Sequence, residues 1–185
     1  MNTTSGLEAR IRRLEDIAAI HDLVGRYGIA MDDRDLAAFP DLFVDDVLLK
    51  SADGVMNARG LSTVTELFRG RFVVLGPSNH FTHDKVITFD DADPDSARGL
   101  VLAHAEMNRN GQAMIAAIRY HDRYRRVGGR WKIAERTLTF FYYVAASEYV
   151  DALGAGLKLR QRAYAEPMPP DWPENLPTWK AYYGT

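Results

Sequence analysis

The order of the predicted elements indicates an α+β fold in which one strongly bent sheet, mixed or antiparallel, wraps around N-terminal helices. Apolar residues recur at spacings of three and four over residues 7–31 and 61–76, which is the pattern of amphipathic helices. Four extended segments follow, separated by the turn sequences DDADPDS, NRNG and VGGR, and they cover residues 79–89, 97–108, 112–127 and 130–143. These segments are long for strands, which favours a strongly bent sheet.

The segments between these elements complete the predicted order. Residues 35–43 predict a short helix or turn broken at Pro40, and residues 44–51 predict a strand that enters a hairpin turn at Asp53 and Gly54. The pair Gly76 and Pro77 is expected to end the second long helix.

The last 40 residues or so differ in composition from the rest of the chain. Residues 147–164 have the pattern of one more helix, and five prolines and two tryptophans then predict an extended arm. We therefore expect a domain over 1–145 and a C-terminal extension over 146–185. The extension is expected to pack on the domain or on a neighbouring subunit.

Composition excludes several classes of function. The 185 residues are 46% hydrophobic and 26% charged, with a formal net charge of −2, so no basic surface for nucleic acid is expected. Cysteine is absent, which excludes disulfides and thiolate chemistry. No apolar run approaches the roughly 20 residues of a membrane span, and the first 16 residues lack the apolar segment of a signal peptide. A cytoplasmic protein is expected.

Three of the five histidines lie on the first two long strands. Strand alternation places His80 and His83 on opposite faces unless a bulge intervenes, which argues against a metal site made by this pair, and we expect no metal. His104, on the next strand, shares its face with Leu100 and Leu102. It can join His80 if His80 faces the concave side of the sheet.

Asp32 is the candidate partner of His80. It follows a long helix, where the helix dipole disfavours a carboxylate, so it would gain from a nearby imidazolium. An aspartate that orients and charges a histidine in an apolar pocket forms a standard general base. The alternatives are that the histidines are ordinary hydrogen-bonded residues and that Asp32 ends its helix in solvent.

Three stretches resemble the SnoaL-like branch of the NTF2-like superfamily of cystatin-like α+β barrels. They are IAAIHDLVGRYGIAMDDRDLAAFPDLFVDDV, SNHFTHDKVITFDD and YHDRYRRVGGRWKIAERTLTFFY, and together they span about residues 10–143. The resemblance implies a cone-shaped barrel. Its nearest functional likenesses are the scytalone dehydratases and the hexachlorocyclohexane dehydrochlorinases, which use a His–Asp pair and no metal or organic cofactor.

The resemblance assigns roles to three residues. Asp32 and His80 match the catalytic pair, and His104 falls where the dehydratase has a further histidine. Two tyrosines of the dehydratase are missing, because Met31 precedes the aspartate and no tyrosine lies near Lys50 and Ser51. This departure puts scytalone itself in doubt as the substrate.

The expected function is a cofactor-independent lyase of the dehydratase type that acts on a small hydrophobic cyclic molecule. His80 would take a proton from carbon, and His104 would bind the substrate oxygen or protonate the leaving hydroxyl. Isomerisation, cyclisation of the polyketide-cyclase type and a non-catalytic binding or assembly module remain open. A homodimer or homotrimer is expected. The candidate pocket walls are Tyr27, Phe43, Phe68, Phe72, Met107, Met114, Phe140 and Tyr142.

Overall fold

The computed structural model describes residues 3–154, 156–164 and 166–184 and confirms an α+β fold. Its helical elements are α1 (Thr3–Asp33), η1 (Leu36–Ala38), α2 (Phe39–Leu42), α3 (Leu61–Val74), η2 (Ala146–Glu148), α4 (Tyr149–Ala152) and α5 (Pro177–Tyr183). Its strands are β1 (Phe43–Ser51), β2 (Asn57–Arg59), β3 (Leu75–Phe89), β4 (Ser96–Arg109), β5 (Gln112–Val127) and β6 (Arg130–Ala145).

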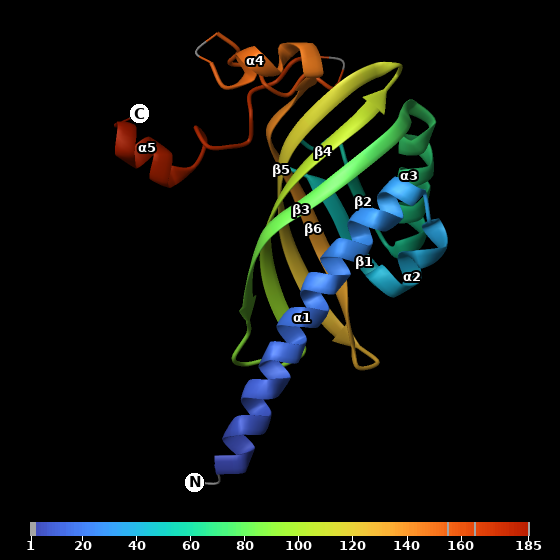
Figure 1. Cartoon of the computed structure of the whole chain (residues 1–185), viewed down its shortest axis with the longest axis vertical. Helices are drawn as coiled ribbons and strands as arrows, with labels where there is room; N and C mark the ends of the chain where they lie inside the picture. Colours follow the sequence, from blue (N-terminus) through green and yellow to red (C-terminus); the bar gives the residue numbers. More distant parts are fainter. Residues whose placement is uncertain (1–2, 155, 165, 185) are drawn as a thin grey trace.

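The strands form one open, six-stranded mixed sheet in the order β2-β1-β6-β5-β4-β3. The pair β1–β6 is parallel and the other pairs are antiparallel. Four strands of 14 to 16 residues curve strongly, as their length predicted (Figure 1). The sheet does not close on itself, so the fold is a cone-shaped wrap rather than a complete barrel.

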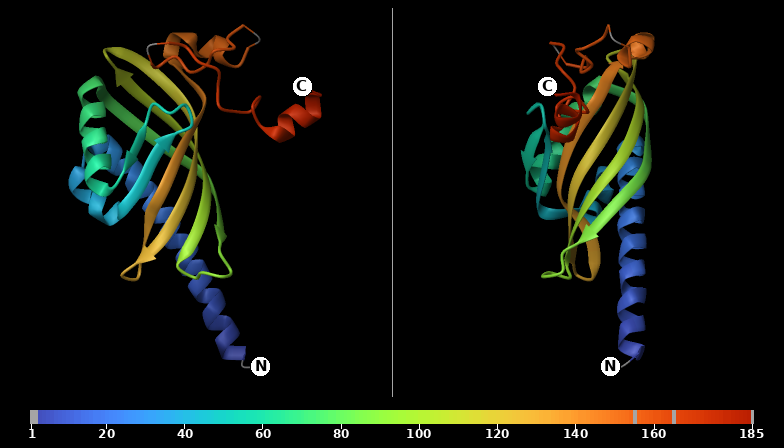
Figure 2. Two further views of the ribbon diagram at one scale, coloured as in Figure 1. Left: turned by 180° about the vertical axis from the view of Figure 1, so that it is seen from behind. Right: turned by 90° about the vertical axis from the view of Figure 1, so that its left-hand side faces the viewer.

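The core lies between the concave face of the sheet and the helices α1, α2 and α3. Figure 1 shows α1 crossing the sheet diagonally, with its N-terminal part projecting past the strands, while Figure 2 shows α4 and the C-terminal segment at the opposite end. The second half of α1 buries one stripe against the sheet: Ile20, Leu23, Val24, Tyr27, Ala30 and Met31. This packing places the C-terminal end of α1 beside the start of β3.

Helix boundaries differ from the sequence-based expectation at three places. Helix α1 runs to Asp33 through Gly25 and Gly28 because tertiary packing outweighs the propensity cost of single glycines. Helix α3 ends at Val74, so Gly76 and Pro77 lie inside β3 instead of before it. The helix predicted over 147–164 is wrong: α4 ends at Ala152, and Gly154 follows two residues later.

β-Bulges in β3 and β6 reverse side-chain directions within single strands. In β3 the register shifts between Thr82 and Lys85, so residues beyond the bulge change face. Ile87 and Phe89 consequently pack on the core together with the face that carries His80, contrary to simple alternation. In β6 the register shifts opposite Ala117 and Ile118, which turns Tyr142 outward and Tyr143 inward.

A buried ion pair joins β5 and β6 beneath the core. Arg136 donates to Asp122 through Nε at 2.8 Å and Nη2 at 2.6 Å, and neither side chain is exposed. The guanidinium lies between the rings of Tyr27 and Tyr120, 4.0 and 4.2 Å from their centroids. Burial opposes the charge of Arg136, but the attraction of Asp122 outweighs it and raises the pKa of the guanidinium.

The C-terminal segment contacts the convex face of the sheet. Trp172 stacks on Phe141 at 4.8 Å between centroids, and the Arg119 guanidinium lies 3.9 Å from the Trp172 ring centroid. Part of the apolar surface of β5 and β6 is therefore covered by the same chain. The division into a domain over 1–145 and an extension over 146–185 stays a prediction. No helix among the described residues is long and apolar enough to span a membrane.

Self-association is expected because apolar side chains remain exposed on the projecting part of α1. Leu7, Ile11 and Leu14 are 55%, 47% and 66% exposed and recur at helical spacing. We expect a homodimer or homotrimer in light scattering at micromolar concentration. Replacing Leu7, Ile11 and Leu14 together by Gln should shift the mass toward the monomer, and a wild-type protein that is already monomeric would refute the expectation.

Candidate active site

Asp32 and His80 form a hydrogen-bonded pair where α1 ends beside β3. Asp32 Oδ1 lies 2.6 Å from His80 Nδ1, and Asp32 Oδ2 accepts the His80 backbone N–H at 2.7 Å. Both side chains are largely buried, at 18% and 19% exposure. Because an ionised carboxylate can only accept, the pairing favours a proton on Nδ1 and leaves Nε2 free to accept a proton.

A relay of donors fixes the aspartate from the other side. Ser78 donates to Asp32 Oδ1 at 2.9 Å, and Arg34 Nη1 donates to Ser78 Oγ at 2.8 Å. Arg34 has a φ of 60°, so the chain turns sharply after α1 and aims the guanidinium back at the start of β3. It also donates to the backbone oxygens of Met31 and Gly76, which ties the helix end to the strand.

These contacts set the protonation of Asp32. Burial raises the pKa of the carboxyl, but hydrogen bonds from the His80 side chain and backbone and from Ser78, together with the charge of His80, outweigh burial. The net pKa of Asp32 is lowered from its ordinary 3.8. Asp32 is therefore an anion at neutral pH and can stabilise an imidazolium on His80.

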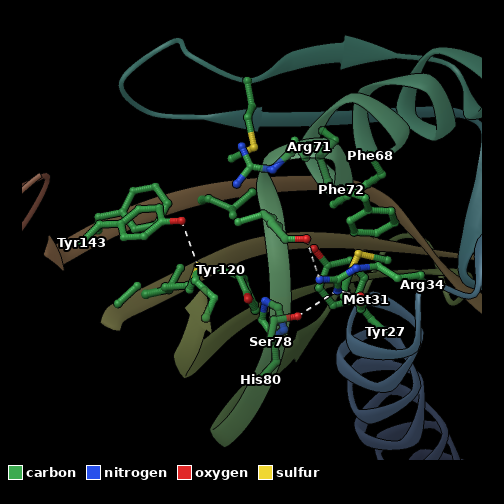
Figure 3. Close-up of a pocket in the computed structure, with 18 residues that line it drawn as sticks. Tyr27, Met31, Arg34, Phe68, Arg71, Phe72, Ser78, His80, Tyr120 and Tyr143 are labelled. Atoms are coloured by element: carbon green, nitrogen blue, oxygen red, sulfur yellow. Dashed lines mark hydrogen bonds between the residues drawn. The ribbon is translucent and has the colours of Figure 1, made fainter. Parts of the chain in front are cut away.

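The pair opens onto a mostly apolar cavity between α1, α3 and the concave face of the sheet (Figure 3). His80 and Ser78 form one side of it, and Arg71 reaches in from α3 on the opposite side. Its further walls are Tyr27, Met31, Arg34, Leu49, Met56, Phe68, Phe72, Leu75, Met107, Ala116, Ile118, Tyr120, Leu138, Phe140 and Tyr143.

The free space in the cavity is small. Its free volume is about 50 Å³. One water needs roughly 10–15 Å³ of such space, so the cavity holds roughly three to five waters, whereas a cavity that takes one benzene measures roughly 150 Å³. A six-membered ring can therefore enter only if wall side chains move.

Five of the eight predicted wall residues line this cavity: Tyr27, Phe68, Phe72, Met107 and Phe140. Phe43 is instead buried in the core against Phe39, and Met114 lies at a shallow hollow near Pro77. Tyr142 is on the outer face because the β6 bulge reverses its direction. These three assignments were wrong for a common reason, since alternation and hydrophobicity do not locate bulges or separate wall from core.

The structure does not bring His104 to His80. His80 pairs with Ala105 across β3 and β4, so His104, one residue away, points to the outer face. There its Nδ1 lies 2.9 Å from His83 Nε2, in a hollow that also contains Tyr142 and Trp172. Burial, and to a lesser extent the charge of His83, lower the pKa of His104. The register of the pairing, which alternation within one strand cannot predict, decides this placement.

Substitution of His104 is expected to leave turnover essentially unchanged. His104→Ala removes a contact with His83 on the outer face and none with the cavity, so kcat should stay within about twofold of wild type and stability should fall slightly. Steady-state kinetics and thermal unfolding of this variant and of His83→Gln measure both effects. A large loss of turnover with an intact fold would place the outer face in the reaction.

Several residues of the cavity were missed in the sequence, and some left a signal. Ser78 is two residues before His80 and therefore shares its face of the strand. Arg71 comes four residues after Leu67 and three after Phe68, so it lies in the apolar stripe of α3. A charged residue in such a stripe indicates a special role. Arg34 and Tyr143 left no signal, since their directions depend on a left-handed turn and a bulge.

No group of three or more His, Cys, Asp or Glu side chains arranged to hold a metal ion is found in the described part of the chain. The polar groups around the cavity are the imidazole of His80, which Asp32 orients, and tyrosine and arginine side chains across the cavity.

The fold and the pair define a class of proteins in which a curved sheet and helices enclose a pocket with an Asp–His pair at its edge. The SnoaL-like domain family matches residues 12–137, more than half of the chain, and the protein belongs to this family. No curated protein sequence matches the chain.

Solved structures show the same fold. A hexachlorocyclohexane dehydrochlorinase (LinA, type 2) is similar with a TM-score of 0.68 and 21% identity, over 74% of this chain and 92% of that one. A candidate scytalone dehydratase from Novosphingobium aromaticivorans has a TM-score of 0.65 and 20% identity, over 72% and 89%. A protein of unknown function from Mycobacterium tuberculosis has a TM-score of 0.62 and 21% identity, over 79% and 82%. At these identities the likeness concerns the fold.

Proposed function

We propose that the protein is a cofactor-independent lyase that eliminates water or a similar small group from a small cyclic substrate. The observation that carries the proposal is the 2.6 Å contact between Asp32 and His80 at the edge of an apolar cavity. The names of two similar structures, a dehydrochlorinase and a candidate dehydratase, agree with elimination chemistry.

Proton abstraction is assigned to His80. Nε2 takes a proton from a substrate carbon, and the electrons of that C–H bond form the new double bond as the leaving group departs from the adjacent carbon. Asp32 keeps Nδ1 protonated and stabilises the imidazolium that forms. The Ser78–Arg34 relay holds Asp32 in place during this change.

Because His104 lies on the outer face, assistance to the leaving group is assigned to hydrogen-bond donors that line the cavity. Tyr27 and Tyr120 are buried, and burial raises the pKa of both phenols, so they stay protonated and can donate hydrogen bonds at neutral pH. The departing hydroxide accepts hydrogen bonds from these phenols and leaves as water with the proton that His80 took from carbon, so the phenols stay protonated and His80 returns to its neutral form.

Proton return to a different carbon would use the same pair and make the protein an isomerase or cyclase. The small free volume favours a second alternative, a non-catalytic binding module, because side chains occupy most of the cavity. These alternatives differ from elimination in their products, so one assay separates them.

The test is a panel of single-ring alcohols, ketones and enones, each with and without a carboxylate on the ring, in deuterated buffer. Ultraviolet absorbance detects a new conjugated double bond, and NMR detects exchange of carbon-bound hydrogen. Elimination supports the lyase, exchange or double-bond migration without elimination supports the isomerase, and a lack of both across the panel rejects catalysis by this pair.

A further inference from the structure

The cavity carries a positive charge that proton abstraction by His80 does not use. Arg71, in the last turn of α3, is half-buried, and Figure 3 shows its side chain reaching into the cavity across from His80. Among the described residues, no carboxylate lies within 4.0 Å of the guanidinium nitrogens of Arg71 or of Arg109.

Arg71 belongs to an arginine–tyrosine cluster, formed with Arg109, Tyr143 and Tyr164. Burial raises the pKa of both phenols, while the charges of Arg71 and Arg109 act in the opposite direction on each. The Arg109 guanidinium lies 5.5 Å from the Tyr164 ring centroid. Arg71 and Tyr143 supply the side of the cluster that faces the cavity.

Hydrogen-bonding capacity in this cluster is left unused. Arg109 Nε donates to Ala163 O at 2.9 Å, but its Nη1 and the Tyr164 hydroxyl are buried without a partner in the part of the chain that the structure describes. Tyr143 donates only to Met107 Sδ, at 2.9 Å, and sulfur is a weak acceptor. Unpaired buried donors beside a cation cost free energy unless a ligand satisfies them.

One acidic group lies near the cluster without neutralising it. The negative charge of Asp53 acts on the Tyr164 hydroxyl and raises its pKa. Asp53 Oδ1 accepts from Ser51 and from the Val55 N–H at 2.9 Å, within its own turn. Its Oδ2 is buried without a partner among the described residues, and no ion pair within 4.0 Å joins it to Arg71 or Arg109. A cation across the cavity from the base therefore remains available for an anionic ligand.

We infer that the substrate is a single-ring carboxylic acid whose carboxylate binds Arg71 while its ring extends toward His80. A guanidinium matches the two oxygens of a carboxylate in planar geometry, and Tyr143 can turn its hydroxyl to the same group. The free space of about 50 Å³ limits the ligand to a single ring, and wall side chains must move to admit it, since a benzene-binding cavity measures roughly 150 Å³. That the bound acid is a substrate rests on the proposed function. That it binds at Arg71 can be measured without turnover.

The experiment compares charged and neutral ligands of one shape. The full chain is titrated calorimetrically with benzoate and cyclohexanecarboxylate and with the corresponding amides. We expect at least one carboxylate to bind about tenfold more tightly than its amide, and Arg71→Gln to abolish the difference. Arg69→Gln is the matched control, because Arg69 lies on the same helix but is 61% exposed and paired with Glu66.

The outcomes separate this inference from the lyase proposal. Equal binding of carboxylates and amides, no binding of either carboxylate, or unchanged carboxylate binding by Arg71→Gln overturns the anion site. If Arg71→Gln does not fold, Arg71→Lys replaces it and should keep part of the preference while losing the forked geometry. If the protein prefers carboxylates to amides through Arg71 but eliminates nothing from the panel, the anion site stands and the lyase proposal is rejected. If neutral alcohols undergo elimination and Arg71→Gln has no effect on it, the lyase proposal stands and the anion site is rejected.

Discussion

Asp32→Asn is expected to lower turnover by about 10²–10⁴-fold while the fold remains intact. The neutral amide no longer stabilises an imidazolium on His80, and its NH₂ group can donate to Nδ1, which would move the ring proton to Nε2. Nε2 could then no longer accept the substrate proton. The rate is measured on the compound that responds in the deuterium and absorbance panel.

The tautomer of His80 gives a second measurement that needs no substrate. Nitrogen NMR of the wild type should show a protonated Nδ1, and Asp32→Asn should shift the proton toward Nε2. Asp33→Asn is the matched control, since Asp33 is the next residue of α1 and makes no contact with His80 in the described structure. Full activity in Asp32→Asn would remove the pair from the mechanism.

Asp122→Ala is expected to produce the largest loss of stability in the molecule, about 3–5 kcal/mol in the free energy of unfolding. The change leaves Arg136 buried with full charge and without its carboxylate, and it also removes the acceptor of the Tyr124 hydroxyl at 2.6 Å. Because Arg136 lies between the rings of Tyr27 and Tyr120, the cavity wall should loosen as well. Urea unfolding followed by circular dichroism measures the effect.

A surface pair provides the comparison for Asp122→Ala. Asp22 pairs with Arg26 at 2.7 Å on α1, with side chains 67% and 48% exposed, so Asp22→Ala should cost less than about 1 kcal/mol. A second variant, Asp122→Ala with Arg136→Met, should recover part of the loss, because it removes the unpaired charge. Equal effects of Asp122→Ala and Asp22→Ala would show that the buried pair contributes no more than a surface one.

Local sequence was sufficient to predict the elements and their order. The 3–4 spacing of apolar residues predicted α1 and α3, and the turn sequences separated the four long strands within a few residues of their bounds. The family resemblance, carried by motifs at both ends of the domain, indicated that Asp32 and His80 come together. The 2.6 Å contact between them agrees, although their catalytic role stays a prediction.

What the sequence by itself determined is therefore the fold class, the family and the meeting of Asp32 with His80, because these depend on short-range periodicity and on ordered motifs. Only the tertiary structure decided which other side chains share the cavity. Bulges in β3 and β6 and the pairing of His80 with Ala105 turned His104 and Tyr142 outward and Tyr143 inward. Arg34 reaches Ser78 through a left-handed turn. Register, bulges and such turns arise from contacts between distant segments, so one strand's pattern cannot specify them.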